Sequence, residues 1–142
     1  MTMLMVESDQ LGSMDVAETS VIEFPAGLIG FPEHRRYAMV GADDGGFYTW
    51  LQSIDEPSLA FLVVVPAPFF PDFAPTIRDE DCAAIGLVEP EDAQLLCMVT
   101  VSDAAVTANL LGPIVLNVRT RLARQVVLND TDLTTKAPIV IT

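Results

Sequence analysis

The sequence is poor in the residue types from which disulfide frameworks and metal centres are built. Its 142 residues include two cysteines, Cys82 and Cys97, one histidine and one tryptophan. The cysteines have neither a Cys-x-x-Cys spacing nor a matching set of His or Cys ligands, so they predict no secreted disulfide framework and no zinc site. We therefore expect a cytoplasmic protein with two inert thiols and without a metal ion or other cofactor.

Basic residues are also scarce. Seven Lys and Arg stand against 20 Asp and Glu, which gives a net charge of −13. This charge opposes unspecific attraction to phosphate backbones and anionic lipids, so we expect no direct nucleic-acid binding. Residues 1–103 hold 18 acids and 3 bases, a net charge of −15, whereas residues 104–142 hold 2 acids and 4 bases, a net charge of +2. The negative charge is therefore concentrated in residues 1–103, whereas the rest of the chain is weakly positive.

No apolar run is long enough to cross a membrane. The longest, residues 59–70, contains Pro66 and Pro68 and falls short of the ~20 residues that a span needs. The first residues, up to Glu7, carry no base and do not predict a signal peptide. Hydrophobic residues nevertheless make up 51% of the chain and the mean hydropathy is +0.42. These values exclude a disordered acidic tail and indicate a dense core, a sticky surface, or both.

Short apolar segments between turn residues predict an all-β fold. Val, Ile, Thr and Phe fill the segments, while Pro, Gly and Asp fill the gaps. Strands are predicted over residues 21–24, 37–40, 47–53, 59–65, 84–88, 95–101, 113–118, 125–128 and 138–141. Such short strands leave no room for long crossover helices, so we expect a small antiparallel β-barrel-like domain or a sandwich.

Helices and domain boundaries are weakly indicated. Acidic residues in a first turn, and Pro90 near a helix start, predict one or two short helices over residues 79–84 and 90–94. Residues 1–20 are polar and weakly patterned, and we expect them to form a loose N-terminal arm. The chain, residues 1–142, is predicted to be one domain.

The sequence shows no catalytic constellation. His34 lies beside a turn and is interpreted as a solvated loop residue rather than a general base. The acidic runs at 79–81 and 89–92 lack the spacing of an EF-hand loop, so solvated turns are the better interpretation. We therefore expect no enzyme activity and no small-molecule substrate. A ligand-binding or metal-binding barrel, or an enzyme that uses clustered carboxylates, stays the alternative.

The best interface candidate is the segment of residues 66–73, which concentrates phenylalanine and proline and precedes an acidic run. The predicted partner-binding residues are Phe69, Phe70, Asp72, Phe73, Asp79, Glu80 and Asp81. An acidic and apolar surface suits partners that are basic, apolar, or both. An equally open interpretation is that the rings plug a barrel end and the acids are hydrated. The basic segment 119–124 is either a second patch or, more simply, a solvated hairpin loop.

Several ordered motifs resemble the FliW family of flagellar assembly factors. They are FPAGLIGFP at 24–32, WLQS at 50–53, LAF at 59–61, VPAPFFPDF at 65–73, TANLLGPIVLN at 107–117 and RLARQVVL at 121–128. The most specific part is Asn109-Leu-x-x-Pro113-Ile-x-x-Asn117 followed by Gln125-Val. Together the motifs cover about residues 20–138.

The resemblance implies a small β-barrel-like protein that is not an enzyme. Such a protein binds flagellin in the cytoplasm and, when free, binds the RNA-binding translational repressor CsrA and relieves its block on flagellin translation. The resemblance further implies that Asp72, Asp79 and Glu80 contribute to an acidic surface facing CsrA. Asn109 and Asn117 are expected to fix strand ends or loops. The composition agrees, because an acidic surface attracts a basic protein and the apolar excess can cover apolar flagellin segments.

Overall fold

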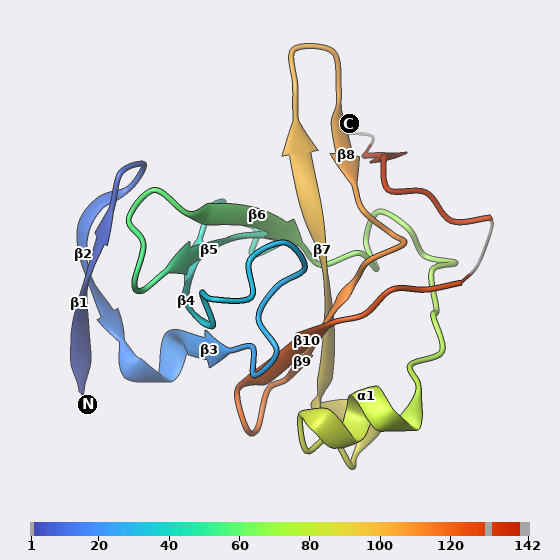
Figure 1. The fold of residues 1–142 in the computed structure, drawn as a ribbon. Coiled ribbons are helices and arrows are strands. Elements are labelled where there is room, and N and C mark those ends of the chain that lie inside the picture. The colour runs from blue at the N-terminus through green and yellow to red at the C-terminus, as the bar shows by residue number, and fades with distance from the viewer. Residues whose placement is uncertain (1, 130–131, 140–142) are drawn as a thin grey trace.

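The computed structural model describes residues 2–129 and 132–139, and seven of its strands close into a barrel (Figure 1). These are β3 (Val21–Glu23), β4 (Arg36–Gly41), β5 (Tyr48–Ser53), β6 (Ala60–Val64), β7 (Ala93–Val101), β9 (Ile114–Asn117) and β10 (Leu122–Gln125). The barrel closes because β7 pairs with both β6 and β9. Neighbouring strands are antiparallel except β3 and β10, which are parallel. The expected all-β barrel with a short helix is confirmed.

Strand β7 serves three neighbours along its nine residues. Its first part pairs with β9, its middle pairs with β6, and its last three residues pair with β8 (Val106–Ala108). Strand β8 in turn pairs with β11 (Ala137–Pro138). The β7–β8 hairpin therefore projects from the barrel and extends the sheet past it (Figure 1).

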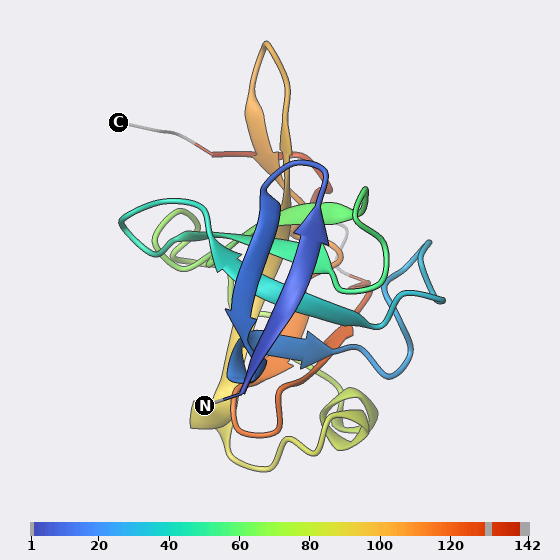
Figure 2. The ribbon, with the colours of Figure 1, turned by 90° about the vertical axis from the view of Figure 1, so that its left-hand side faces the viewer.

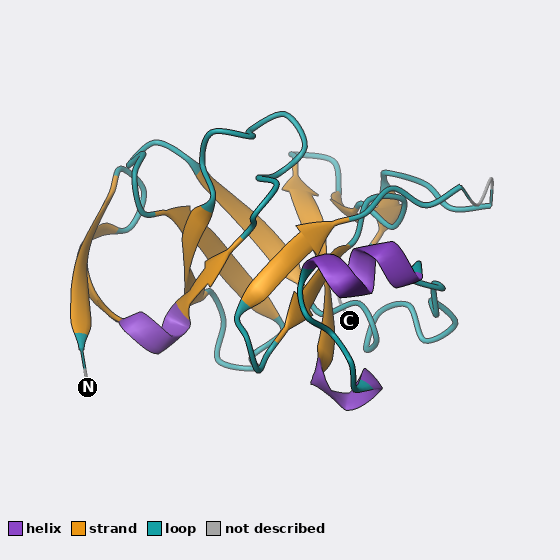
Figure 3. Ribbon diagram, turned by 60° about the horizontal axis from the view of Figure 1, so that its bottom comes forward, coloured by secondary structure: helices purple, strands orange, loops and turns teal. Residues whose placement is uncertain are grey.

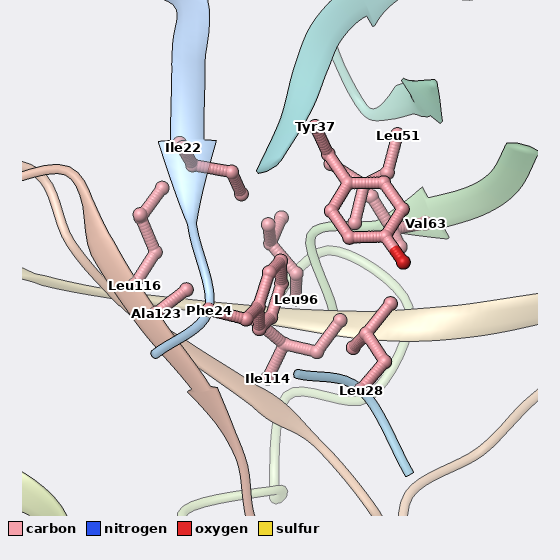
Figure 4. Packing of buried hydrophobic residues seen from close by; sticks show 10 residues of the cluster. All are labelled: Ile22, Phe24, Leu28, Tyr37, Leu51, Val63, Leu96, Ile114, Leu116 and Ala123. Atoms are coloured by element: carbon pink, nitrogen blue, oxygen red, sulfur yellow. The ribbon is translucent and has the colours of Figure 1, made fainter. Parts of the chain in front are cut away.

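Ten buried side chains from all sides of the barrel fill its interior (Figure 4). They are Ile22, Phe24, Leu28, Tyr37, Leu51, Val63, Leu96, Ile114, Leu116 and Ala123. The rings of Phe24 and Tyr37, both fully buried, meet edge to face with centroids 5.5 Å apart. Each large apolar side chain buried in this way stabilises the fold by about 1.5–3 kcal/mol.

The N-terminal residues form a hairpin instead of the loose arm expected for residues 1–20. Strands β1 (Met3–Ser8) and β2 (Gly12–Ala17) pair with each other over their whole length. The hairpin lies across the outside of the barrel (Figure 2), where Val6 and Val16 pack against Ala38 of β4. The segment is ordered because tertiary contacts cover the apolar residues on its inner face.

The helices lie at the periphery of the fold (Figure 3). Helix α1 (Asp79–Ala84) matches the first predicted helix, and the second is a single 3-10 turn over Pro90–Asp92. The predicted strand over residues 84–88 is wrong. Alternating Ile85 and Leu87 resemble a strand in sequence, but both pack against the barrel's outer wall after α1 ends. No helix in the described part of the chain is long and apolar enough to span a bilayer.

Two further strand predictions differ from the structure. Strand β8 was missed, because only Val106 and Thr107 of its three residues are strand formers. The strand predicted over 125–128 lies earlier, as β10, so that the basic segment 119–124 is half turn and half strand rather than a solvated loop. Of the strand predicted over 138–141, residues 140–141 lie outside the described residues.

Candidate partner-binding site

The segment of residues 66–73, which we call the Phe-rich loop, folds as two consecutive turns. The N–H groups of Phe69 and Phe70 donate to the carbonyl oxygen of Pro66 at 3.0 and 2.8 Å. The N–H group of Phe73 donates to the carbonyl oxygen of Phe70 at 3.0 Å. The three rings are thus held on a short, internally bonded segment.

All three rings of the Phe-rich loop are half-buried against an apolar cluster outside the barrel. The buried members of this second cluster are Val64, Cys97, Ala108, Leu110, Ala137 and Ile139. The ring of Phe69 also meets Phe47 and Tyr48, with centroids 5.9 and 6.0 Å apart. The rings therefore do not plug the barrel interior, which a different set of residues fills, and they do not stand free in solvent.

A groove of about 380 Å³ opens beside the Phe-rich loop. Its apolar walls come from Phe73, Pro75, Leu128 and Leu133, and Asp72 lies at its border. A smaller hollow of about 110 Å³ shares three lining residues with the groove and continues along the chain after β10 as far as the start of α1. We call the two together the trough. Sequence reasoning missed its far wall, since those residues follow the Phe-rich loop by more than fifty positions.

Exposed carboxylates border the trough. Asp72 lies at the groove, and Asp79 and Glu80 are exposed on the first turn of α1. Glu80 Oε1 lies 3.4 Å from Arg78 Nη1, but both side chains are more than 60% exposed, so this ion pair contributes little. Among the described residues no ion pair engages Asp72 or Asp79. The rim of the trough is therefore negatively charged.

Asp81 does not belong to this exposed rim, although the sequence placed it there. Its side chain is only 4% exposed and lies between two guanidinium groups. Arg124 Nε donates to its Oδ1 at 2.7 Å, and Arg78 Nε donates to its Oδ2 at 3.3 Å. Charge-assisted hydrogen bonds of this kind are about twice as strong as neutral ones. Asp81 therefore ties α1 to β10.

Three amides fix the loops around the barrel. Asn109 Oδ1 accepts from the N–H groups of the two residues before Pro113, at 3.0 and 2.9 Å. Asn117, which is buried, donates from Nδ2 to the carbonyl oxygen of Ile85 at 3.0 Å and so holds the segment after α1. Gln125 accepts from the N–H of Ile29 and donates to the carbonyl oxygen of Gly112, each at 3.1 Å. Sequence reasoning named the two asparagines but gave Gln125 no role.

In the described residues, the two cysteines and the acidic runs do not come together in one site. Burial raises the pKa of Cys97 to about 12, which disfavours its thiolate. Cys82 is half-buried on α1. Within the part of the chain that the structure describes, no three His, Cys, Asp or Glu side chains are placed to hold a metal ion together.

This chain matches proteins of one family over nearly its whole length. The family profile described as FliW protein matches residues 5–139. The flagellar assembly factor FliW of Natranaerobius thermophilus is 38% identical over 137 residues, which cover 94% of this chain and 91% of that protein. The protein of the same name from Heliobacterium modesticaldum is 38% identical over 133 residues, covering 92% and 87%.

A solved structure shares the fold. A crystal structure of the flagellar assembly factor FliW superposes with a TM-score of 0.87 at 28% identity, and the match covers 97% of this chain and 98% of that one. The family match includes the barrel, the Phe-rich loop and both walls of the trough. This chain therefore belongs to the FliW family.

Proposed function

We propose that this chain is a cytoplasmic flagellar assembly factor that binds flagellin and, when free, binds the translational repressor CsrA and relieves repression of flagellin translation. The observation that carries the proposal is the FliW family match over residues 5–139, together with relatives named flagellar assembly factor. Flagellin and CsrA are the partners that the family resemblance implies. No chemical step is part of this function.

The trough supports the proposal because it offers a negative rim and apolar walls on one side of the molecule. An RNA-binding protein carries basic side chains on the surface that contacts the RNA. Asp72, Asp79 and Glu80 are exposed where such side chains could approach them. The net charge of −13 adds long-range attraction, which speeds the encounter with a basic partner.

The same net negative charge explains how binding of this chain would antagonise CsrA. A CsrA molecule with this chain bound carries the additional negative charge of this chain. An RNA phosphate backbone approaching the complex is repelled, so repression weakens. Binding alone is sufficient for this effect.

Calorimetry with the cognate flagellin and the cognate CsrA tests the proposal. We expect 1:1 binding to flagellin, and CsrA binding that weakens as salt rises from ~50 to ~500 mM, because salt screens exposed charges. The absence of an interaction with either protein would overturn the proposal.

Matched charge reversals test the trough. The double variant Asp79→Lys/Glu80→Lys and the control Glu89→Lys/Glu91→Lys change exposed acids and shift the net charge equally. We expect the first to weaken CsrA binding by about tenfold or more and the control to have a much smaller effect, because close charge pairs depend on position. Equal losses would mean that net charge, rather than the trough, governs binding.

A thermal-shift screen addresses the alternative of a ligand-binding or metal-binding barrel. Divalent metal ions and a metabolite panel are added to the purified chain. Any ligand that binds the folded state raises its melting temperature. We expect no large shift, and a large one would favour the alternative.

A further inference from the structure

The N-terminal hairpin presents an unpaired strand edge. In the described part of the chain, β1 and β2 form a sheet of two strands, so β1 is hydrogen-bonded along one edge only. Figure 2 shows the hairpin lying over the barrel, with β1 and β2 side by side. Natural proteins usually protect such an edge with proline, lysine or a covering segment, because it can pair with another chain. Strand β1, with the sequence MLMVES, has neither proline nor lysine.

Hydrogen bonds hold the hairpin at both ends. At the turn, Asp9 N–H donates to the carbonyl oxygen of Pro57 at 2.9 Å, and Ser8 Oγ accepts from two backbone N–H groups. At the base, Arg121 Nη1 donates to the carbonyl oxygen of Glu18 at 2.8 Å. The free edge is therefore already fixed in position, which lowers the entropy cost of adding a strand to it.

The outer face of the hairpin is both apolar and acidic. Met3 and Met5 are 50% and 63% exposed, although large apolar side chains are usually covered. Glu7 lies on the same face of β1, and Asp15 lies opposite Met5 on β2. Residues 2–20 contain no basic residue. This face therefore suits long basic side chains, whose stems cover apolar surface while their charged ends pair with carboxylates.

We propose that the free edge of β1 is a docking site for an extended segment of a protein partner, which pairs with β1 as a third strand and carries Lys or Arg alternating with apolar residues. Side chains of an added strand alternate between its two faces. Those on the outer face lie beside Met5 and Glu7, where basic residues fit, and those on the inner face lie beside Leu4 and Val6, where apolar residues fit. This site is separate from the trough and does not rest on the proposed function.

Charge selects such a partner over a second copy of this chain. A second copy would bring its own net charge of −13 and an equally acidic hairpin to the same edge. Like charges across a sheet destabilise the pairing, whereas opposite charges contribute roughly 0.2–1 kcal/mol for each pair. Self-association through β1 is thus disfavoured at low salt.

A nine-residue peptide of alternating lysine and valine serves as the probe. Its affinity is measured by fluorescence anisotropy, and hydrogen exchange locates its contact. We expect binding that protects the amides of residues 3–8. The same peptide methylated at every backbone nitrogen keeps its charge but cannot donate a strand hydrogen bond, and we expect it to bind at least about tenfold more weakly.

Matched variants of the chain complete the test. The double variant Glu7→Lys/Asp15→Lys should weaken peptide binding by about tenfold, while the control Asp44→Lys/Asp103→Lys, with the same change of charge at exposed acids, should change it much less. Four results would overturn the proposal: no peptide binding, equal binding of the methylated peptide, protection outside residues 3–8, or equal losses in both variants. A dimer through β1 in light scattering would assign the edge to a second copy instead.

Discussion

The barrel interior and the layer outside it are stabilised by different kinds of interaction. Inside, ten buried side chains pack together, and all of them are apolar except the hydroxyl of Tyr37. Outside, smaller apolar clusters also pack against the barrel, and polar groups add further ties, such as Asp81 between two arginines and Asn117 on the carbonyl oxygen of Ile85. The comparison indicates that apolar packing in the interior contributes most to the stability of the fold, whereas the polar ties add less stability and help to position α1 at the trough.

The largest effect is expected from removing a ring inside the barrel. Phe24→Ala should lower the free energy of unfolding by about 4 kcal/mol, because it leaves a cavity that the closed barrel cannot fill. The matched substitution outside, Phe47→Ala, removes a ring that is 41% exposed, and it should cost about 1 kcal/mol. Chemical denaturation measures both. Equal losses would remove the distinction between the two regions.

A smaller effect is expected from the polar tie of α1. Asp81→Asn removes the carboxylate that two guanidinium groups share, and it should cost about 2 kcal/mol while shifting α1 at the trough. Glu80→Gln, on the same helix, breaks only an exposed ion pair and should cost less than about 0.5 kcal/mol. A weakening of CsrA binding in Asp81→Asn, beyond what unfolding explains, would support the positioning role. Unchanged stability in that variant would contradict it.

The smallest effect appears at alkaline pH. It concerns Tyr37 of the barrel interior and Cys97 of the apolar cluster outside the barrel, which can be told apart by the pH at which each affects stability. Burial raises the pKa of Cys97 from 9.0 to about 12 and that of Tyr37 from 10.0 to about 12. The unfolded chain therefore loses these protons first, and the stability of the fold falls as pH rises from 9 towards 12. At pH 9.5 we expect a loss of about 1 kcal/mol, mainly from Cys97. Cys97→Ala should flatten the denaturation profile from pH 9, and Tyr37→Phe only above pH 10; a flat profile in the parent chain would contradict both shifts.

The sequence predicted the barrel strands because their apolar runs end at proline, glycine and aspartate turns. The prediction from sequence failed where the packing contact of an apolar residue exists only in the folded chain. Ile85 and Leu87 alternate like a strand but pack the segment after α1 onto the barrel. Val6 and Val16 form too weak a pattern on their own and become ordered against Ala38.

The candidate site was predicted in part for a similar reason. The Phe-rich loop and the acids at 79–81 stand out in composition, but composition cannot tell which acid turns inward. Asp81 is buried because Arg124, which follows it by 43 positions, reaches it across the fold. The far wall of the trough includes Leu128 and Leu133. The sequence predicted a strand at Leu128, but nothing in the sequence linked either residue to the Phe-rich loop.

Hydrogen exchange in the presence of saturating cognate CsrA tests most directly whether the barrel is a scaffold and the outer layer recognises partners. We predict slower exchange in residues 72–80 and 126–129, which form and border the trough, and unchanged exchange in barrel residues 93–96 and 114–117. Slowing confined to the barrel strands, or no slowing anywhere, would contradict the account.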